Sequence, residues 1–402
     1  MIFLIKLRRG TVNLPLHGGH APSYLIKRMI SLSSSISKII IEEKGTNEFF
    51  KNISDPLWFQ AFGCVLGFDW HSSGLTTVVT GVLKQALSNG FHGVSIAGGK
   101  GKRSTATKIE IPRLAEKHYN LSTEKVSRLL YASKMSAKVD NSAIQDGYTL
   151  YHHVVFFDKN GNWTIIQQGL NKNNRMARRY HWISDDLKSY IIDPHKGIIS
   201  SERLSNVLNM TSKDSEDNRK TSVDLAKSGS GLIQSSIKKI PVKLNEVKLD
   251  NWIENKNDQM NSSKNISSFE SAMYEEYEMP RRLNWKIFDK IYDIQPSNYE
   301  ELLDIQGLGP AAIRALALIS EMIYEDKASW KDPVKFSYAH GGKDGVPYPI
   351  AKKTYDISIK YLSDVIKGSE NKNYEKENAL KRLSNYSNNI FRTNEYDFNA
   401  EK

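Results

Sequence analysis

The feature that most constrains the fold is a glycine-containing turn between two apolar helical patterns, in residues 298–323. The first pattern is short and ends at Ile305. The second begins at Pro310, whose fixed φ angle suits the first position of a helix. Gly307 and Gly309 lie between the two patterns, and glycine lets one backbone approach another closely. We therefore predict two packed helices joined by a tight turn.

This pattern resembles the helix-hairpin-helix motif of DNA-binding proteins, in which an apolar-x-Gly-apolar-Gly turn joins two packed helices. The backbone N–H groups at the start of the second helix then point outward and suit a phosphate. Such a contact reads no bases. The resemblance implies DNA contacts at Gly307, Leu308, Gly309, Ala311 and Arg314. The alternative is a tight helical hairpin that touches only protein.

Composition limits the class of protein. The chain has 402 residues, long enough for two domains, and 56 Lys and Arg against 45 Asp and Glu give a net charge of +11. An anionic partner is therefore plausible, although a solvated lysine-rich surface explains much of the excess. The single cysteine, Cys64, excludes a disulfide framework within one chain and a cysteine-based zinc site. No apolar run is long enough for a membrane helix, so we expect a cytoplasmic protein without a membrane partner.

Residues 1–208 alternate between strand-like and helix-like patterns, which indicates an α/β domain with a mixed sheet and helices. The expected elements are a helix from about Ser23, a strand at 62–67, a helix at 78–88, a strand at 93–97, and helices entered at Pro112 and after Ser122.

The most informative part of this region is a predicted β-hairpin. Leu150–Phe157 and Trp163–Gln168 are rich in β-branched and aromatic residues, and a five-residue loop separates them. If Phe157 faces Trp163, then His153 lies opposite Gln167 and His152 opposite Gln168. The end near the turn is apolar on both faces, as expected of buried strands, whereas the far end is polar on both. Buried polar groups need partners, because an unpaired one costs about 1–3 kcal/mol.

The residues around this polar end suggest a catalytic centre for phosphodiester hydrolysis, which needs a base or metal-held water and cations beside the phosphoryl group. We expect catalytic side chains at Lys138, Asp146, His152, His153, Gln167 and His71. Candidate carboxylate ligands for a divalent metal, Mg²⁺ or Mn²⁺, are Asp69, Asp140 and Asp146. Further phosphate contacts are expected from Lys100, Lys102, Arg178 and Arg179.

Each of these residues also has a structural interpretation. A histidine at a strand end is often only hydrogen-bonded, Asp146-Gly147 suits a plain turn, and Arg178 to His181 suit a solvated helix face. The loop from Gly98 to Arg103 suits a phosphate site but equally a flexible basic turn.

Several blocks of the chain together resemble an archaeal and bacterial family named "domain of unknown function 763". The blocks are Leu14–Pro22, Phe68–Gly74, Ala97–Lys102, Ser136–Asn141, Gln145–Tyr148 with His152-His153, Ala177–Trp182 and Ala339–Pro347. The resemblance covers most of the chain outside about 209–270. It implies a helix-hairpin-helix element and an action on DNA as a nuclease or repair factor, without assigning catalytic residues.

Two weaker similarities point to nucleases. His152-His153 on a strand is similar to a half-site of the phospholipase D superfamily, but that motif needs a lysine where Val154 or Val155 stands. A restriction-endonuclease-like core pairs an acid such as Asp146 with a strand that carries Gln167. The lysine expected two positions later is absent.

The second half of the chain is expected to contain three regions. Residues 209–270 are poor in aromatics and suggest a flexible polar linker with one short ordered piece near Ile240–Trp252. Residues 271–366 suggest a helical DNA-binding domain that includes the hairpin and a later helix through Tyr355, Ile359 and Leu362. Residues 367–402 suggest a polar, frayed tail.

The sequence therefore predicts an α/β domain tethered to a helical DNA-holding module. The leading hypothesis is a nuclease of DNA repair or recombination, with repair proteins as possible partners. The alternative is a non-catalytic DNA-binding or scaffolding factor.

Overall fold

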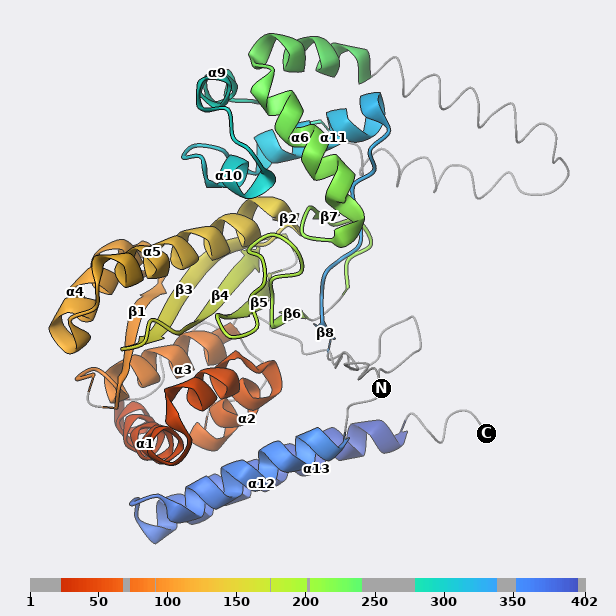
Figure 1. Ribbon diagram of the computed structural model, residues 1–402. Helices are drawn as coiled ribbons and strands as arrows, with labels where there is room; N and C mark the ends of the chain where they lie inside the picture. Colours follow the sequence, from red (N-terminus) through yellow and green to blue (C-terminus); the bar gives the residue numbers. More distant parts are fainter. Residues whose placement is uncertain are drawn as a thin grey trace, which may run out of the picture.

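The computed structural model describes residues 23–67, 73–90, 92–173, 175–200, 203–240, 279–337 and 352–396. Asp69 and His71, the residues before Ser23, and Ala339–Pro347 lie outside these residues. Figure 1 shows a central sheet between helices, with a further group of helices above one end of it. The fold class is as predicted, an α/β part with a mixed sheet followed by a mainly helical part.

The sheet has six strands in the order β1-β3-β4-β5-β6-β8. The strands are β1 (Val94–Lys100), β3 (Thr149–Asp158), β4 (Trp163–Asn171), β5 (Met176–Ile183), β6 (Gly197–Ser200) and β8 (Phe336–Ser337). Neighbouring strands are antiparallel except β6 and β8, which are parallel. A separate antiparallel pair joins β2 (Ile144–Gln145) to β7 (Leu208–Asn209).

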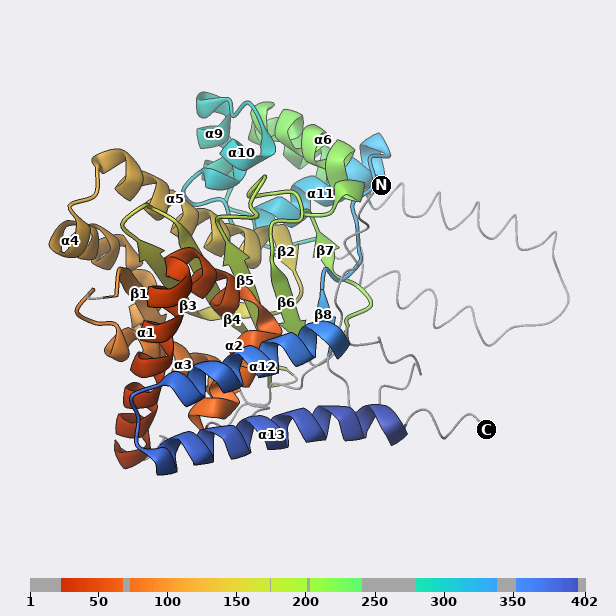
Figure 2. The ribbon, with the colours of Figure 1, turned by 60° about the horizontal axis from the view of Figure 1, so that its bottom comes forward.

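Helices cover both faces of the sheet (Figures 1 and 2). One face packs on α1 (Ser23–Ser54), α2 (Pro56–Leu66) and α3 (Ser73–Ala86), and α12 (Lys352–Gly368) and α13 (Asn373–Tyr396) share its core. The other face packs on α4 (Thr107–Tyr119) and α5 (Thr123–Lys138). We call the core on the side of α1–α3 the first core and the core on the side of α4 and α5 the second core. Successive residues of a strand point to opposite faces, so Val154 and Phe156 belong to the first core and Val155 and Phe157 to the second.

The second core continues without interruption into the C-terminal helices, which are α9 (Trp285–Ile294), α10 (Tyr299–Asp304) and α11 (Pro310–Tyr324). Leu302, Leu308 and Ile313 belong to the same buried cluster as Val139 and Ala143 of the α/β part. These helices are therefore packed against the sheet domain and do not form a separately tethered unit.

Several predicted elements are confirmed. Helix α5 begins after Ser122, whose side chain accepts a hydrogen bond from the Lys125 N–H, and α1, α3, β1 and α12 occur where expected. Helix α4 begins at Thr107, earlier than predicted, because the short 3₁₀ helix Gly101–Ala106 leads directly into it.

The predicted strand at 62–67 is wrong, because these residues belong to helix α2. The Asp55 carboxylate accepts hydrogen bonds from the backbone N–H groups of Leu57 (2.8 Å) and Trp58 (3.0 Å), and Pro56 occupies the first turn. Every residue of α2 is buried. A helix that is apolar on all sides carries no amphipathic pattern, so its sequence alone cannot be told from that of a buried strand.

Residues 209–240 are ordered rather than a flexible linker. They contain the 3₁₀ helix Lys213–Ser215, α6 (Glu216–Lys227) and a helical run at 230–240. Val223, Leu225 and Ile233 are buried in the second core, and the Asn218 amide donates to the Ala317 carbonyl (3.0 Å). Residues 241–270 lie outside the described residues.

The C-terminal segment is not a frayed tail through residue 396, because α13 packs against α2. It also runs alongside α12 (Figure 2). Ala379 and Leu383 of α13 are buried in the first core. The Arg382 guanidinium donates from Nε to the Val65 carbonyl at 2.9 Å, near the end of α2. The polar composition of this segment reflects the wide solvent-facing side of a helix that buries only a narrow apolar stripe.

Candidate functional site

The predicted hairpin register is confirmed. Phe157 pairs with Trp163, His153 with Gln167, and His152 with Gln168. The polar end of the hairpin therefore exists, and its side chains alternate between the two faces of the sheet. His153 and Gln167 point toward α5, whereas His152 and Gln168 point toward α3.

On the side of α5, a chain of hydrogen bonds forms the α5-face cluster: Ser133, Asp140, His153, Gln167, Trp182 and His195. The Gln167 amide nitrogen donates to Asp140 Oδ2 (2.6 Å), so its oxygen faces His153 and accepts from Nδ1 (2.9 Å). His153 Nε2 lies 2.8 Å from the Ser133 hydroxyl, which is also placed to donate to the Thr107 hydroxyl (3.1 Å). The bond from Nδ1 to Gln167 fixes one tautomer of a neutral His153.

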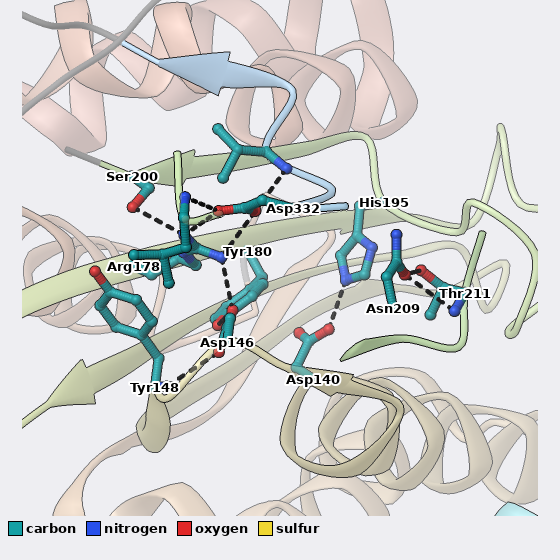
Figure 3. A network of polar contacts seen from close by, with 12 residues as sticks. Asp140, Asp146, Tyr148, Arg178, Tyr180, His195, Ser200, Asn209, Thr211 and Asp332 are labelled. Atoms are coloured by element: carbon teal, nitrogen blue, oxygen red, sulfur yellow. Dashed lines mark hydrogen bonds and ion pairs between the residues drawn. The ribbon is translucent and has the colours of Figure 1, made fainter. Parts of the chain in front are cut away.

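Asp140 lies at the other end of this chain, and both of its oxygens have partners. Trp182 donates from Nε1 to Oδ2 at 3.1 Å. His195 Nε2 lies 2.5 Å from Oδ1 (Figure 3). Burial raises the pKa of the Asp140 carboxyl, an effect that the neighbouring His195 opposes. Sequence reasoning missed His195, which stands alone in a loop with no motif around it.

A second group, the Arg178 network, consists of Asp146, Arg178, Tyr180, Ser200 and Asp332 (Figure 3). Arg178 donates to Asp146 Oδ2 (2.9 Å) and, through two nitrogens, to both oxygens of Asp332 (3.1 and 2.8 Å). Tyr180 also donates to Asp146 (2.7 Å). Burial alone lowers the pKa of Arg178, but the two carboxylates more than offset this, so the pKa is raised and the guanidinium stays charged.

On the opposite face, the α3-face cluster contains Thr76, Thr80, Tyr151, His152, Gln168, Arg179 and His181. The Thr80 hydroxyl donates to the Thr76 carbonyl (2.8 Å), so Nε2 of His152 is the donor in its 3.0 Å contact with Thr80. The Gln168 amide donates to the Ser73 carbonyl (2.9 Å) and to Tyr151. Arg179 Nε lies 2.8 Å from His181 Nε2.

Both histidines of the hairpin are neutral at pH 7. Burial lowers the pKa of His152 to about 3, with the neighbouring His153 and Lys100 adding to the effect. Burial lowers the pKa of His153 to about 4, which its bond to Gln167 partly opposes. The exposed fractions of the two side chains are only 1% and 5%. Their imidazoles therefore make hydrogen bonds inside the protein at the polar end of the hairpin and do not face solvent in this conformation.

The candidate metal ligands are not arranged as a metal site. Asp140 is engaged by Trp182, Gln167 and His195, while Asp146 is engaged by Arg178, whose charge competes with a cation. Within the described residues, no three His, Cys, Asp or Glu side chains gather closely enough to hold a metal ion. The described donors therefore do not fit a divalent metal, and Asp69 lies outside them.

The predicted phosphate contacts fall into two groups. Arg178 and Arg179 are 0% and 1% exposed, so neither reaches a phosphate on the surface. Lys100 and Lys102 are exposed at the end of β1 and in the turn that follows it. The adjoining Gly98 N–H already donates to Glu110 (2.7 Å), and its carbonyl accepts from Lys84 (2.7 Å). That loop therefore offers side-chain cations, whereas the Gly98 amide is occupied.

The turn between α10 and α11 lies at the surface. Gly307 and Pro310 are exposed, Gly309 and Ala311 are partly exposed, and Leu308 is buried. Gly307 has φ of 98°, a left-handed conformation that favours glycine. Arg314, one turn into α11, lies over the Trp330 ring at 5.2 Å. The predicted pair of packed helices and its tight turn are thus present.

Lys138 does not join the polar clusters of the sheet. It is the last residue of α5, and its ammonium donates to the carbonyls of Ile305 and Leu308 in the α10–α11 turn. Burial lowers the pKa of Lys138 to about 8, with Lys134 adding to the effect and Asp304 opposing it.

Fold and site together define a mixed α/β protein whose sheet ends in buried polar networks and whose C-terminal helices present an exposed turn. The chain belongs to the family described as protein of unknown function (DUF763), whose model matches residues 10–350. The resemblance to this family is thereby confirmed. Comparison with curated proteins and with solved structures gives no match. Among the described helices, none combines the length and apolar character needed to cross a membrane.

The neutral histidines predict how stability depends on pH. Their folded-state pKa values, about 3 and about 4, lie below the usual value of 6.5, so the unfolded chain binds more protons in acid. Their contribution is full above pH 6.5 and is lost as pH falls toward 4, by about 1.4 kcal/mol per pH unit for each histidine. His153→Gln should flatten the parent's slope between pH 6 and 5 by about that amount.

The measurement is urea unfolding of parent and variant at pH 7, 6 and 5. The difference between the two slopes isolates His153 from Asp140 and the other groups that titrate in this range. Equal slopes in the two proteins would show that His153 is not held neutral.

Proposed function

We propose that the protein binds DNA by holding backbone phosphates at the N-terminus of α11, as a helix-hairpin-helix does. The proposal rests on the first turn of α11, where no side chain caps the backbone N–H groups. Gly309 is its N-cap residue and supplies no side-chain cap, and Pro310 has no N–H to offer. The N–H groups of the first turn and the positive end of a 15-residue helix then suit an anion.

The charge around the turn supports an anionic partner. Lys286 and Lys290 of α9 are exposed, and Lys290 Nζ lies 3.5 Å from the Gln306 carbonyl in the turn. The whole chain carries +11. Contacts of this kind are independent of sequence and weaken as salt rises. They suit a protein that acts on chromosomal DNA inside the cell, in repair or recombination, beside other repair proteins.

The geometry favours a binding or scaffolding role over catalysis. Among the residues expected to catalyse hydrolysis, Asp146, His153 and Gln167 are hydrogen-bonded within the buried networks of the sheet, and the described residues supply no metal site. Phosphodiester hydrolysis is the second candidate. It is supported by the chain from Ser133 through His153 and Gln167 to Asp140, because Ser133 lies on the same helix as Lys138, which contacts the turn.

The first test is Gly309→Glu. A Cβ at Gly309 meets nothing within 4 Å, and φ is −128°, so a side chain fits without strain. The added carboxylate lies at the proposed phosphate site, and like charges repel there, so duplex DNA should bind on the order of tenfold more weakly. Fluorescence anisotropy with labelled duplexes of two unrelated sequences measures the effect.

Gly231→Glu is the matched control. It makes the same change of charge at a glycine whose Cβ also has open space, in the helical run 230–240. This variant should bind DNA within about twofold of the parent, since one distant surface charge is largely screened. Equal weakening of both variants would indicate only a general charge effect and would refute the proposed site.

The second test separates binding from hydrolysis. Single-stranded, duplex and branched DNA, each end-labelled, are incubated with the parent and with His153→Ala in EDTA, Mg²⁺ or Mn²⁺. We expect bound but intact DNA in every case, because His153 is buried and committed to Ser133 and Gln167. Metal-dependent cleavage that disappears in His153→Ala would establish the nuclease instead. Cleavage that persists in EDTA would support a metal-independent nuclease.

A further inference from the structure

Two side chains of the α/β part donate hydrogen bonds to backbone carbonyls of the α10–α11 turn. Lys138 Nζ donates to the carbonyl oxygens of Ile305 (2.9 Å) and Leu308 (2.7 Å), one on each side of Gly307. The side-chain amide of Gln145 donates to the Pro310 carbonyl (2.8 Å). Three carbonyls of the turn are thus fixed by two residues that come from α5 and β2.

These contacts also fix the direction of two N–H groups. A trans peptide unit is planar, and its C=O and N–H bonds point to opposite sides. The chain has no cis peptide bond among the described residues. The peptide unit whose carbonyl belongs to Leu308 contributes the N–H of Gly309, so this N–H points away from Lys138. By the same argument, the bond from Gln145 to the Pro310 carbonyl directs the N–H of Ala311 away from Gln145.

We infer that Lys138, assisted by Gln145, is a positioning residue for the DNA phosphate. It orients the N–H groups of Gly309 and Ala311 toward the phosphate without contacting the phosphate itself. This inference rests on the proposed function. It also means that both parts of the chain build the phosphate site, because the turn comes from the C-terminal helices and the ammonium from α5 (Figure 1).

The neighbour Lys134 provides a matched control. It lies four residues earlier on α5 and contacts the same helix pair, but through the side chain of Asp304 at 2.5 Å and not through a carbonyl of the turn. Its side chain is 41% exposed, so the ion pair is worth little. Lys134→Met therefore removes the same charge near the same place without releasing the carbonyls.

The experiment measures duplex DNA affinity over a range of salt for the parent, Lys138→Met, Lys134→Met and Lys138→Arg. Lys138→Met should weaken binding on the order of tenfold, because the charge-assisted bonds that orient the turn are lost. Lys134→Met should change it by less than about twofold. Lys138→Arg should restore most of the affinity, since a guanidinium also donates to two carbonyls.

The salt dependence distinguishes positioning from contact. A lysine that pairs with a phosphate contributes nearly one unit to the slope of log K against log salt. Lys138→Met should leave this slope unchanged although affinity falls. A slope smaller by about one unit would show a direct phosphate contact and would overturn the inference.

A double-mutant cycle links the lysine to the phosphate site. In the Gly309→Glu background, Lys138→Met should weaken binding by less than about twofold, because the two changes disable one site. Additive losses would overturn the inference. If Gly309→Glu alone has no effect, the proposed function fails; if only the Lys138 variants bind like the parent, the inference fails and the proposed function stands.

Lys138→Met removes the donor from the Leu308 carbonyl, whereas the Ile305 carbonyl keeps its bond from the Leu308 N–H (3.2 Å), so folding of the variant is checked by circular dichroism and thermal melting. If it does not fold, Gln145→Ala decides the question, because it releases only the Pro310 carbonyl. About threefold weaker binding with an unchanged salt slope supports the positioning role. Parent-like binding by Gln145→Ala overturns it.

Discussion

The arrangement of the whole molecule depends on one fully buried guanidinium. Arg178 on β5 bonds to Asp146, which precedes β3, and to Asp332, which follows α11. Breaking a buried pair of this kind typically costs about 3–5 kcal/mol, because the remaining charge is left without a partner. Asp332 also accepts hydrogen bonds from the backbone N–H groups of Leu204 (2.8 Å) and Val334 (3.0 Å). The chain that leaves the C-terminal helices is therefore fixed to the sheet.

This anchor gives the exposed turn a fixed position relative to the sheet. The helices that carry the turn share the core behind α5, and Lys138 reaches the turn from the end of that helix. The polar residues of the sheet face inward and are hydrogen-bonded within the buried networks, whereas the backbone of the turn faces solvent. The buried networks therefore provide stability and orientation, and the proposed DNA contact lies at the start of α11.

The sequence predicted features that depend on neighbouring residues. The β3–β4 register followed from Phe157 opposite Trp163, and the start of α5 followed from Ser122. Features that depend on distant partners were missed: Asp332 is 154 positions from Arg178, and His195 is 55 from Asp140. No local sequence pattern indicates such a pair. The sequence also predicts Arg178 and Arg179 as surface cations, because arginine is rarely buried in a protein unless it is paired, and an adjacent pair needs partners for both.

Amide hydrogen exchange of the parent protein, with and without saturating duplex DNA, shows which part of the protein binds DNA. We expect slower exchange at the N–H groups of Gly309, Ala311 and Ala312 in the complex, and unchanged exchange at His152 and His153 of β3. Slower exchange at the polar end of β3 and β4, with no change in the first turn of α11, would contradict this expectation and place the DNA at the sheet.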